Sequence, residues 1–157
     1  MLIETPEAPM TATSSTGEPR YSDGYTANHA APARARRDAA LYLRTWGLDA
    51  LVDDAQLIVS ELVTNAVLQA ADRSRDKGTG RVGMSATRTE TGVRLVVTDT
   101  DRTPPRLRPM KGGRGQWEGG PGLGLVADLA ARWGCDRLSS GKRLWAELDI
   151  AEEPTAR

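Results

Sequence analysis

A carboxylate and a carboxamide that could do chemistry lie four residues apart in one helical stretch. The stretch is Ile58-Val-Ser-Glu61-Leu62-Val-Thr-Asn65-Ala66. At 100° per residue, Glu61 and Asn65 are neighbours on a helix surface, next to an apolar sector. A glutamate can act as a general base, and Mg²⁺ accepts an amide oxygen together with phosphate oxygens. Because such pairs are also common on solvated helices, this spacing alone leaves both interpretations open.

Two further segments offer groups to a ligand. Asp99 closes an apolar strand, where it could accept a hydrogen bond from a ligand amine, although Asp also commonly starts turns. The run Gly119-Gly-Pro-Gly122-Leu-Gly124 precedes an amphipathic helix, and such glycines let backbone N–H groups approach an anion. The run lacks the Lys of a Walker A motif and does not directly follow a strand, so a plain linker is the alternative.

The elements that must position these residues follow from hydrophobic periodicity. Helices are expected at about residues 32–44, ending at Gly47, and at 50–71, with Asp49 as the N-cap. Strands are expected at 81–88 and 93–98, an irregular segment from 99 to about 120, a helix from the glycine run to Trp133, and a final hairpin of 135–138 and 144–150 with a turn at 139–142. This clustering favours an α+β sandwich, in which a mixed sheet carries helices on one face.

Length and composition fit one domain. The chain has 157 residues and is 39% hydrophobic, enough for one core over residues 31–150. Residues 1–30 are rich in Thr, Ser, Pro and Gly and are expected to form a disordered or loosely ordered tail, with His29 as a solvated residue near its end. Residues 151–157 are expected to form a short polar tail.

Charge and cysteine content exclude some classes of function. Lys plus Arg and Asp plus Glu number 21 each, which argues against a dedicated nucleic-acid binder. Cys135 is the single cysteine, which fits a reducing compartment. The sequence shows no run of about 20 apolar residues and no secretion signal. The expectation is a cytoplasmic protein with no direct nucleic-acid partner and no membrane partner.

These motifs, in this order, resemble those of the GHKL (Bergerat-fold) ATPase and kinase superfamily. Its N box is similar to the helix segment that contains Glu61 and Asn65, its G1 box to Val96-Val-Thr-Asp99, and its G2 box to Gly120-Pro-Gly122-Leu-Gly124. Segments around Trp46, 131–134 and 141–148 make the chain similar to small stand-alone ATP-binding proteins of the anti-sigma factor serine/threonine kinase type. The resemblance spans about residues 33–149.

The resemblance implies a fold and a role for each motif. The fold would be a Bergerat-type two-layer α/β sandwich with a mixed, mostly antiparallel sheet and helices on one face. Glu61 would be the general base, Asn65 would hold Mg²⁺ and Asp99 would contact the adenine amino group of ATP. Residues 100–119 would form the lid over ATP. The phosphates would be bound by the second box, at Gly120, Gly122, Leu123 and Gly124.

The chain departs from the family pattern at three places. Asp101 and Thr103 stand where the G1 box has glycines, and Gln69 stands where many relatives have a histidine after the N box. A phosphoacceptor histidine with its dimerisation helices is absent, which argues against a sensor histidine kinase.

Two functions follow from the resemblance. One is an ATP- and Mg²⁺-dependent protein-serine/threonine kinase of the anti-sigma regulatory type. Its partners would be an anti-anti-sigma-type protein, a sigma factor or both, and because relatives often form dimers, a homodimer is a further expectation. The alternative is an interaction module that sequesters a sigma factor or another regulator with weak or no nucleotide chemistry.

Overall fold

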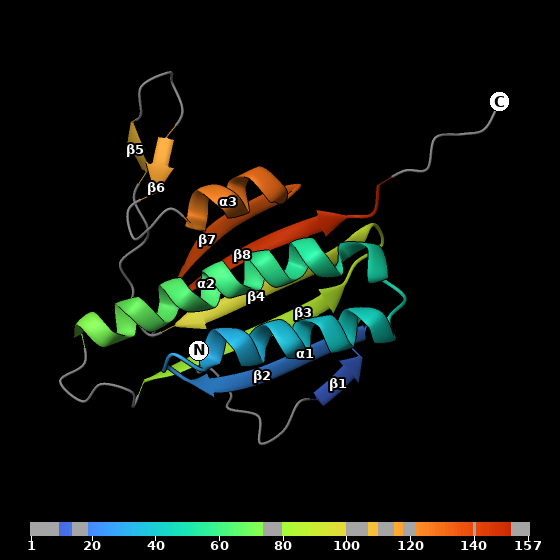
Figure 1. Cartoon of the computed structure of the whole chain (residues 1–157), viewed down its shortest axis with the longest axis horizontal. Helices are drawn as coiled ribbons and strands as arrows, with labels where there is room; N and C mark the ends of the chain where they lie inside the picture. The colour runs from blue at the N-terminus through green and yellow to red at the C-terminus, as the bar shows by residue number, and fades with distance from the viewer. Residues whose placement is uncertain are drawn as a thin grey trace.

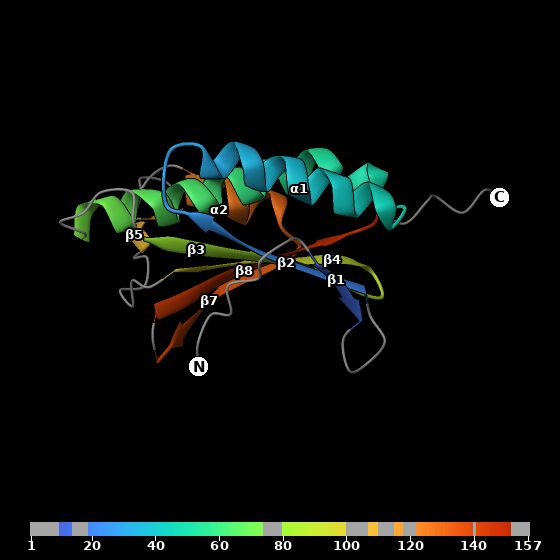
Figure 2. The same ribbon diagram turned by 90° about the horizontal axis from the view of Figure 1, so that it is seen from below.

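The structure, a computed structural model, stacks a layer of helices on a β-sheet (Figures 1 and 2). It describes residues 10–13, 19–73, 80–99, 107–109, 115–117, 122–139 and 141–151. The strands are β1 (Met10–Thr13), β2 (Pro19–Thr26), β3 (Arg81–Arg88), β4 (Gly92–Asp99), β5 (Leu107–Pro109), β6 (Gly115–Trp117), β7 (Arg132–Leu138) and β8 (Gly141–Asp149). The helices are α1 (Ala31–Thr45), the 3₁₀ turn η1 (Asp49–Leu51), α2 (Val52–Arg73) and α3 (Gly122–Leu129).

Six strands form the main sheet, in the order β1-β2-β3-β4-β8-β7. Every strand pair in the described part of the chain is antiparallel. The predicted hairpin of β3 and β4 is confirmed, with Met84 opposite Val97, and so is the final hairpin, with Cys135 opposite Leu144. β4 therefore lies inside the sheet, between β3 and β8.

All three α-helices cover one face of this sheet (Figure 2). α1 and α2 lie side by side, and α2 also contacts β4, β8 and α3. Alanines at four-residue spacing form the buried side of α1, and Gly47, with a φ of +74°, follows its end. Ile58 and Leu62 of α2 are buried in the same core as Leu95 of β4. The expected fold class, an α+β two-layer sandwich with helices on one face, is confirmed. The sheet was expected to be mixed, but its described strand pairs are all antiparallel.

The expected tail over residues 1–30 is wrong for Pro19–Thr26, which form β2 and pair with β3 along its length. Two buried tyrosines fasten β2 to the helix layer. The Tyr25 hydroxyl donates to Asp38 Oδ2 on α1 at 2.6 Å, and the Tyr21 hydroxyl lies 3.1 Å from the same oxygen and 3.0 Å from the Tyr25 hydroxyl. Burial, together with the nearby Asp38 carboxylate, raises the pKa of both hydroxyls far above the ordinary value.

Three boundary predictions need correction. The third helix ends at Leu129, and Trp133 and Gly134 belong to β7, where a Cβ on Gly134 would come within 2.8 Å of the Trp145 side chain. Asp49 begins η1 and is not the N-cap. Lys142, expected in a turn, is the second residue of β8. Within the segment expected to be irregular, β5 and β6 pair as a small separate sheet, and most other residues of that segment lie outside the described part.

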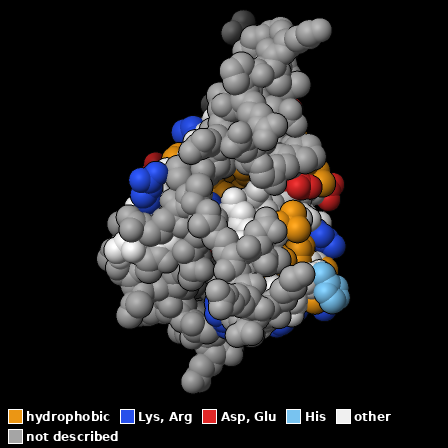
Figure 3. All heavy atoms as spheres, turned by 90° about the vertical axis from the view of Figure 1, so that its left-hand side faces the viewer, with side chains coloured by type: hydrophobic (Ala, Val, Ile, Leu, Met, Phe, Trp, Pro, Cys, Tyr) orange, Lys and Arg blue, Asp and Glu red, His pale blue; other side chains and the backbone are white. Residues whose placement is uncertain are grey.

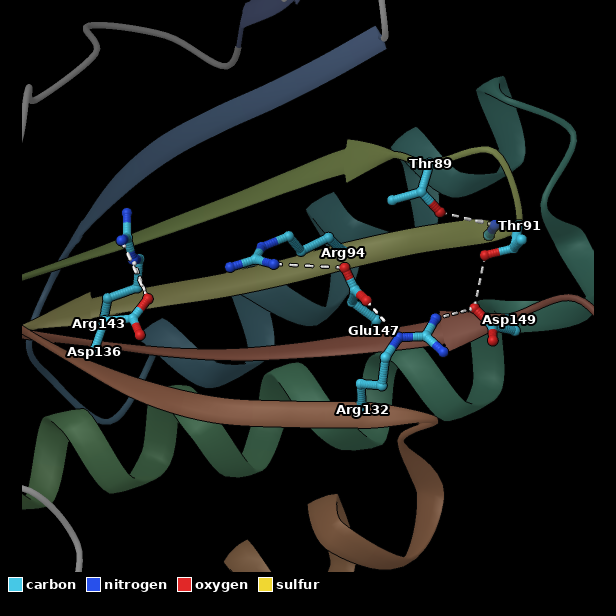
Figure 4. Close-up of polar contacts among 9 residues, drawn as sticks. Thr89, Thr91, Arg94, Arg132, Asp136, Arg143, Glu147 and Asp149 are labelled. Atoms are coloured by element: carbon cyan, nitrogen blue, oxygen red, sulfur yellow. Dashed lines mark hydrogen bonds and ion pairs between the residues drawn. The ribbon is translucent and has the colours of Figure 1, made fainter.

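The face of the sheet opposite the helices carries a row of charged side chains (Figure 4). Arg132 reaches Glu147 and Asp149, each at 2.7 Å, and Arg94 lies 3.5 Å from the other oxygen of Glu147. The Arg94 guanidinium also lies 4.3 Å from the ring centroid of Trp145. Hydrogen bonding from Arg132 lowers the pKa of Asp149. Because these pairs are solvated, they add little to the stability of the fold.

The Tyr21 and Tyr25 hydroxyls should make the fold less stable at alkaline pH. The unfolded chain releases these protons near pH 10.0, and the folded chain holds them to higher pH. Each tyrosine should therefore lower the free energy of unfolding by about 1.4 kcal/mol per pH unit above its unfolded pKa. Urea denaturation from about pH 8 to 11 measures this slope. The Tyr21→Phe/Tyr25→Phe variant should lose that part of the slope, and an unchanged slope would contradict the assignment.

Candidate functional site: the end of the sheet at Asp99 and Lys142

Helix α2 carries three polar side chains at four-residue intervals, Glu61, Asn65 and Gln69. With 3.6 residues per turn, this spacing places them along one side of the helix. Asn65 is buried, with 5% of its surface exposed, and Glu61 and Gln69 are half-buried. The stripe borders the core that Leu62 and Ala66 help to form. The sequence prediction of a polar pair at the edge of an apolar face is therefore confirmed.

Asp99 is the last residue of β4 and lies opposite Lys142 of β8 in the sheet register. Lys142 Nζ lies 3.3 Å from Asp99 Oδ1, with both residues buried, at 0% and 3% exposure respectively. The same ammonium donates a hydrogen bond to Oε1 of Gln69. One ammonium thus joins β8, the end of β4 and the C-terminal half of α2.

The start of α3 lies at the same end of the molecule as this cluster. β4 ends, and β8 and α3 begin, at the same end of the molecule (Figure 1), and α3 packs against α2. Gly122 is the first residue of α3, and Leu123 is buried in the core. A Cβ added to Gly124 would meet no atom within 4 Å, so there is open space next to this residue. Gly120 lies outside the described residues.

Figure 3 looks onto this end of the molecule. Among the described side chains, apolar, basic and acidic groups come to the surface close to one another. The described side chains visible on this face thus carry both signs of charge.

Asp99 at the end of β4 and the start of α3 lie at the same end of the molecule, and Asn65 lies on α2, four residues before Gln69. Glu61 lies farther along α2, eight residues before Gln69, which corresponds to about 12 Å of helix. Sequence reasoning missed Lys142. Its alternation with Leu144, Ala146 and Leu148, all buried, was the available signal that it faces the core.

The donor set fits a magnesium ion only together with a ligand. Among the described residues, no group of three or more His, Cys, Asp and Glu side chains could hold a metal. Glu61 and Asn65 offer oxygen ligands, and phosphate oxygens and water would have to complete the six positions that Mg²⁺ prefers.

The described chain also contains no helix with both the length and the hydropathy for crossing a membrane.

The sequence matches a known domain. Residues 25–147 fit the family model of the histidine kinase-like ATPase domain, over most of the chain. The chain belongs to this family. The resemblance to the GHKL superfamily that the three motifs indicated is therefore confirmed. No curated protein matches the sequence.

One similar solved structure is that of the RsbU and RsbW domains of Rv1364c from Mycobacterium tuberculosis. The TM-score is 0.55 at 18% sequence identity, and the match covers 83% of this chain and 34% of that chain. At this identity the likeness shows a common fold. The chain spans about a third of the length of the protein it matches, so this histidine kinase-like ATPase domain corresponds to part of a longer relative.

Removing one charge of the buried pair should destabilise the domain. Lys142→Met leaves the Asp99 carboxylate buried without its ammonium, which should cost about 3–5 kcal/mol. Adding Asp99→Asn should recover much of this loss. Arg143→Met is the matched control, because Arg143 is the next residue of β8 and pairs with Asp136 in a half-exposed bridge worth about 0–1 kcal/mol. Chemical denaturation compares the variants, and equal losses for Lys142→Met and Arg143→Met would contradict the buried pair.

Proposed function

We propose that this domain binds Mg²⁺-ATP and transfers its γ-phosphoryl group to a serine or threonine of a small partner protein. The family match to an ATPase domain carries the proposal. The site supports it, since Asp99 is a buried acceptor at the end of β4, there is open space at Gly124 in the glycine motif, and Asn65 lies on α2, the helix that packs against both β4 and α3.

Each residue has a task in this reaction. Asp99 accepts a hydrogen bond from the base, and the backbone N–H groups at the start of α3 bind phosphate oxygens. Asn65 would offer its amide oxygen to Mg²⁺, and the ion when bound would neutralise charge on the phosphates. Glu61 accepts the proton of the partner's hydroxyl as the hydroxyl oxygen bonds to the γ-phosphorus. The bond between that phosphorus and the bridging oxygen breaks, and ADP leaves.

The partner follows from the regulatory type that the sequence resembles. We infer an anti-anti-sigma-type protein as the phosphoacceptor, a sigma factor as a second partner, and action in the cytoplasm, as a homodimer like many relatives. The likeness to a solved structure with an RsbW domain supports this choice.

Replacing the proposed base should separate chemistry from binding. Glu61→Gln keeps the size and polarity of the side chain but cannot accept the proton. It should keep the Kd for Mg²⁺-ATP and slow phosphoryl transfer by about 10²–10⁴-fold. The phosphoacceptor is the partner protein that co-purifies with the unaltered chain. Mass spectrometry of the phosphorylated partner over time measures the rate of transfer. Glu90→Gln, at an exposed position in the turn between β3 and β4, is the control. A Glu61→Gln variant as fast as this control would remove Glu61 from the role.

Asn65 should couple nucleotide affinity to magnesium. In the unaltered protein, chelating Mg²⁺ with EDTA should weaken ATP binding. Asn65→Ala should bind Mg²⁺-ATP about 10–100-fold more weakly, because an oxygen of the metal site is lost. It should also respond less to EDTA. Calorimetric titration with and without Mg²⁺ gives both values, and an undiminished EDTA effect in the variant would show that Asn65 does not hold the metal.

A second function is favoured by one observation. Asp99, the proposed acceptor for the base, already forms an ion pair with Lys142. The domain would then act as an interaction module that sequesters a sigma factor or another regulator without phosphorylating it. Titration of the purified protein with millimolar Mg²⁺-ATP distinguishes the two, because a pure interaction module gives no saturable signal.

A further inference from the structure

Two large apolar side chains of α2 are exposed to solvent, and both lie on the same side of the helix as Glu61. Leu57 is 46% exposed and Leu68 is 55% exposed. At 100° per residue, both lie within about 40° of Glu61 around the helix axis, and Thr64 lies within about 60°. Along the axis, Leu57 is about 6 Å and Leu68 about 10 Å from Glu61. These four residues form the outer stripe of α2.

The outer stripe carries little charge for a helix surface that faces solvent. Glu61 is the only charged residue between positions 55 and 71 of the sequence. A surface helix normally has charged residues on its solvent side, and α1 follows this rule with Arg34 and Arg37, which are both exposed. No other described element covers the outer side of α1 and α2 (Figure 2). Single exposed leucines are common on proteins, but two leucines on one stripe with a lone carboxylate indicate a surface that a partner covers.

Hydrogen bonds to α1 hold this side of α2 in place. Arg36 Nη1 donates to the Ser60 hydroxyl at 2.9 Å, and Gln56 Nε2 donates to the Arg36 carbonyl oxygen at 3.3 Å. Ser60 directly precedes Glu61, and Gln56 directly precedes Leu57. The position of the outer stripe is therefore fixed before a partner binds, so docking costs little free energy for ordering it.

We propose that the outer stripe is the surface on which the phosphoacceptor protein docks, with Leu57 and Leu68 as apolar anchors on either side of Glu61. The inference rests on the proposed function, because it takes Glu61 as the base. The acceptor hydroxyl must come within about 2.6–3.2 Å of the Glu61 carboxylate to lose its proton. A protein interface of ordinary size covers about 800 Å² on each partner, which is a disc about 16 Å in radius. Both leucines therefore lie inside an interface of this size that is centred on Glu61.

The outer stripe also defines the chemistry of the partner surface. The serine or threonine that is phosphorylated should have apolar side chains on both sides, which pack on the two leucines and exclude water from Glu61. Asn65 is buried and lies about 40° from Glu61 around the axis, on the side away from Leu57. The acceptor hydroxyl would thus reach the base from the solvent side, and the proposed metal ligand lies on the core side of the base.

The test uses the full chain, Mg²⁺-ATP and, purified on its own, the protein that co-purifies with the unaltered chain and becomes phosphorylated. Leu57→Gln and Leu68→Gln keep a residue that favours a helix but remove the apolar anchor. Each should raise the KM for the partner about 5–30-fold, as expected when an anchoring side chain of an interface is lost. The kcat at saturating partner and the Kd for Mg²⁺-ATP should not change, whereas a merely structural role of the leucines would alter them as well.

Ile150→Gln is the matched control. Ile150 is 49% exposed and follows β8 at the end of the sheet opposite Asp99, so this variant should keep the KM of the unaltered chain. Leucine variants with the same KM as this control would overturn the inference. A changed oligomeric state of Leu57→Gln in light scattering, without a change in KM, would also overturn it and assign the stripe to a second copy of the chain. If the unaltered chain transfers no phosphate to the partner, the proposed function fails and the inference fails with it, whereas transfer with an unchanged KM refutes the inference alone.

Discussion

The buried ammonium of Lys142 determines how the functional end of this domain is assembled. It belongs to β8, pairs with the carboxylate at the end of β4 and binds an amide on α2. Charges in such a place need close partners, because the desolvation of an unpaired ion costs several kcal/mol. The end of the sheet and the C-terminal half of the helix are therefore held in one arrangement, and the other site residues take their positions from it.

A buried ion pair is not needed to stabilise a protein core. Apolar residues of similar volume often stabilise a fold equally well or better, so a buried pair is weak grounds for a purely structural role. At this position the pair lies where the sequence motifs predict the base of a nucleotide. The same contact that fastens the sheet to the helix layer thus gives the site its polarity, with a donor next to an acceptor.

The sequence predicted most of the fold because its strands and helices have clear periods. The buried positions of β3 alternate at Val82, Met84 and Ala86, and the motif on α2 repeats every four residues. β2 was missed because its buried residues are two tyrosines and an aspartate between polar residues and a glycine, which do not form an apolar pattern. Their partner, Asp38, lies on a different element, and one sequence does not show that contact.

Boundaries and the site's electrostatics were harder to predict for the same reason. Trp133 continues the helical pattern by composition, but the pairing of β7 with β8 fixes Trp133 and Gly134 as strand. Lys142 follows Gly141 and suits a turn by local chemistry, and its strand position depends on β4, more than 40 residues earlier. Glu61, Asn65 and Asp99 could be found as separate motifs. The ammonium that neutralises Asp99 could be found only from the fold.

A crystal structure of the full chain with Mg²⁺ and a non-hydrolysable ATP analogue tests the central claim most directly. The account predicts the base against Asp99, the metal at Asn65 and the phosphates at the start of α3. A nucleotide bound elsewhere on the domain, or a complex in which Asp99 makes no contact with the base, would contradict it.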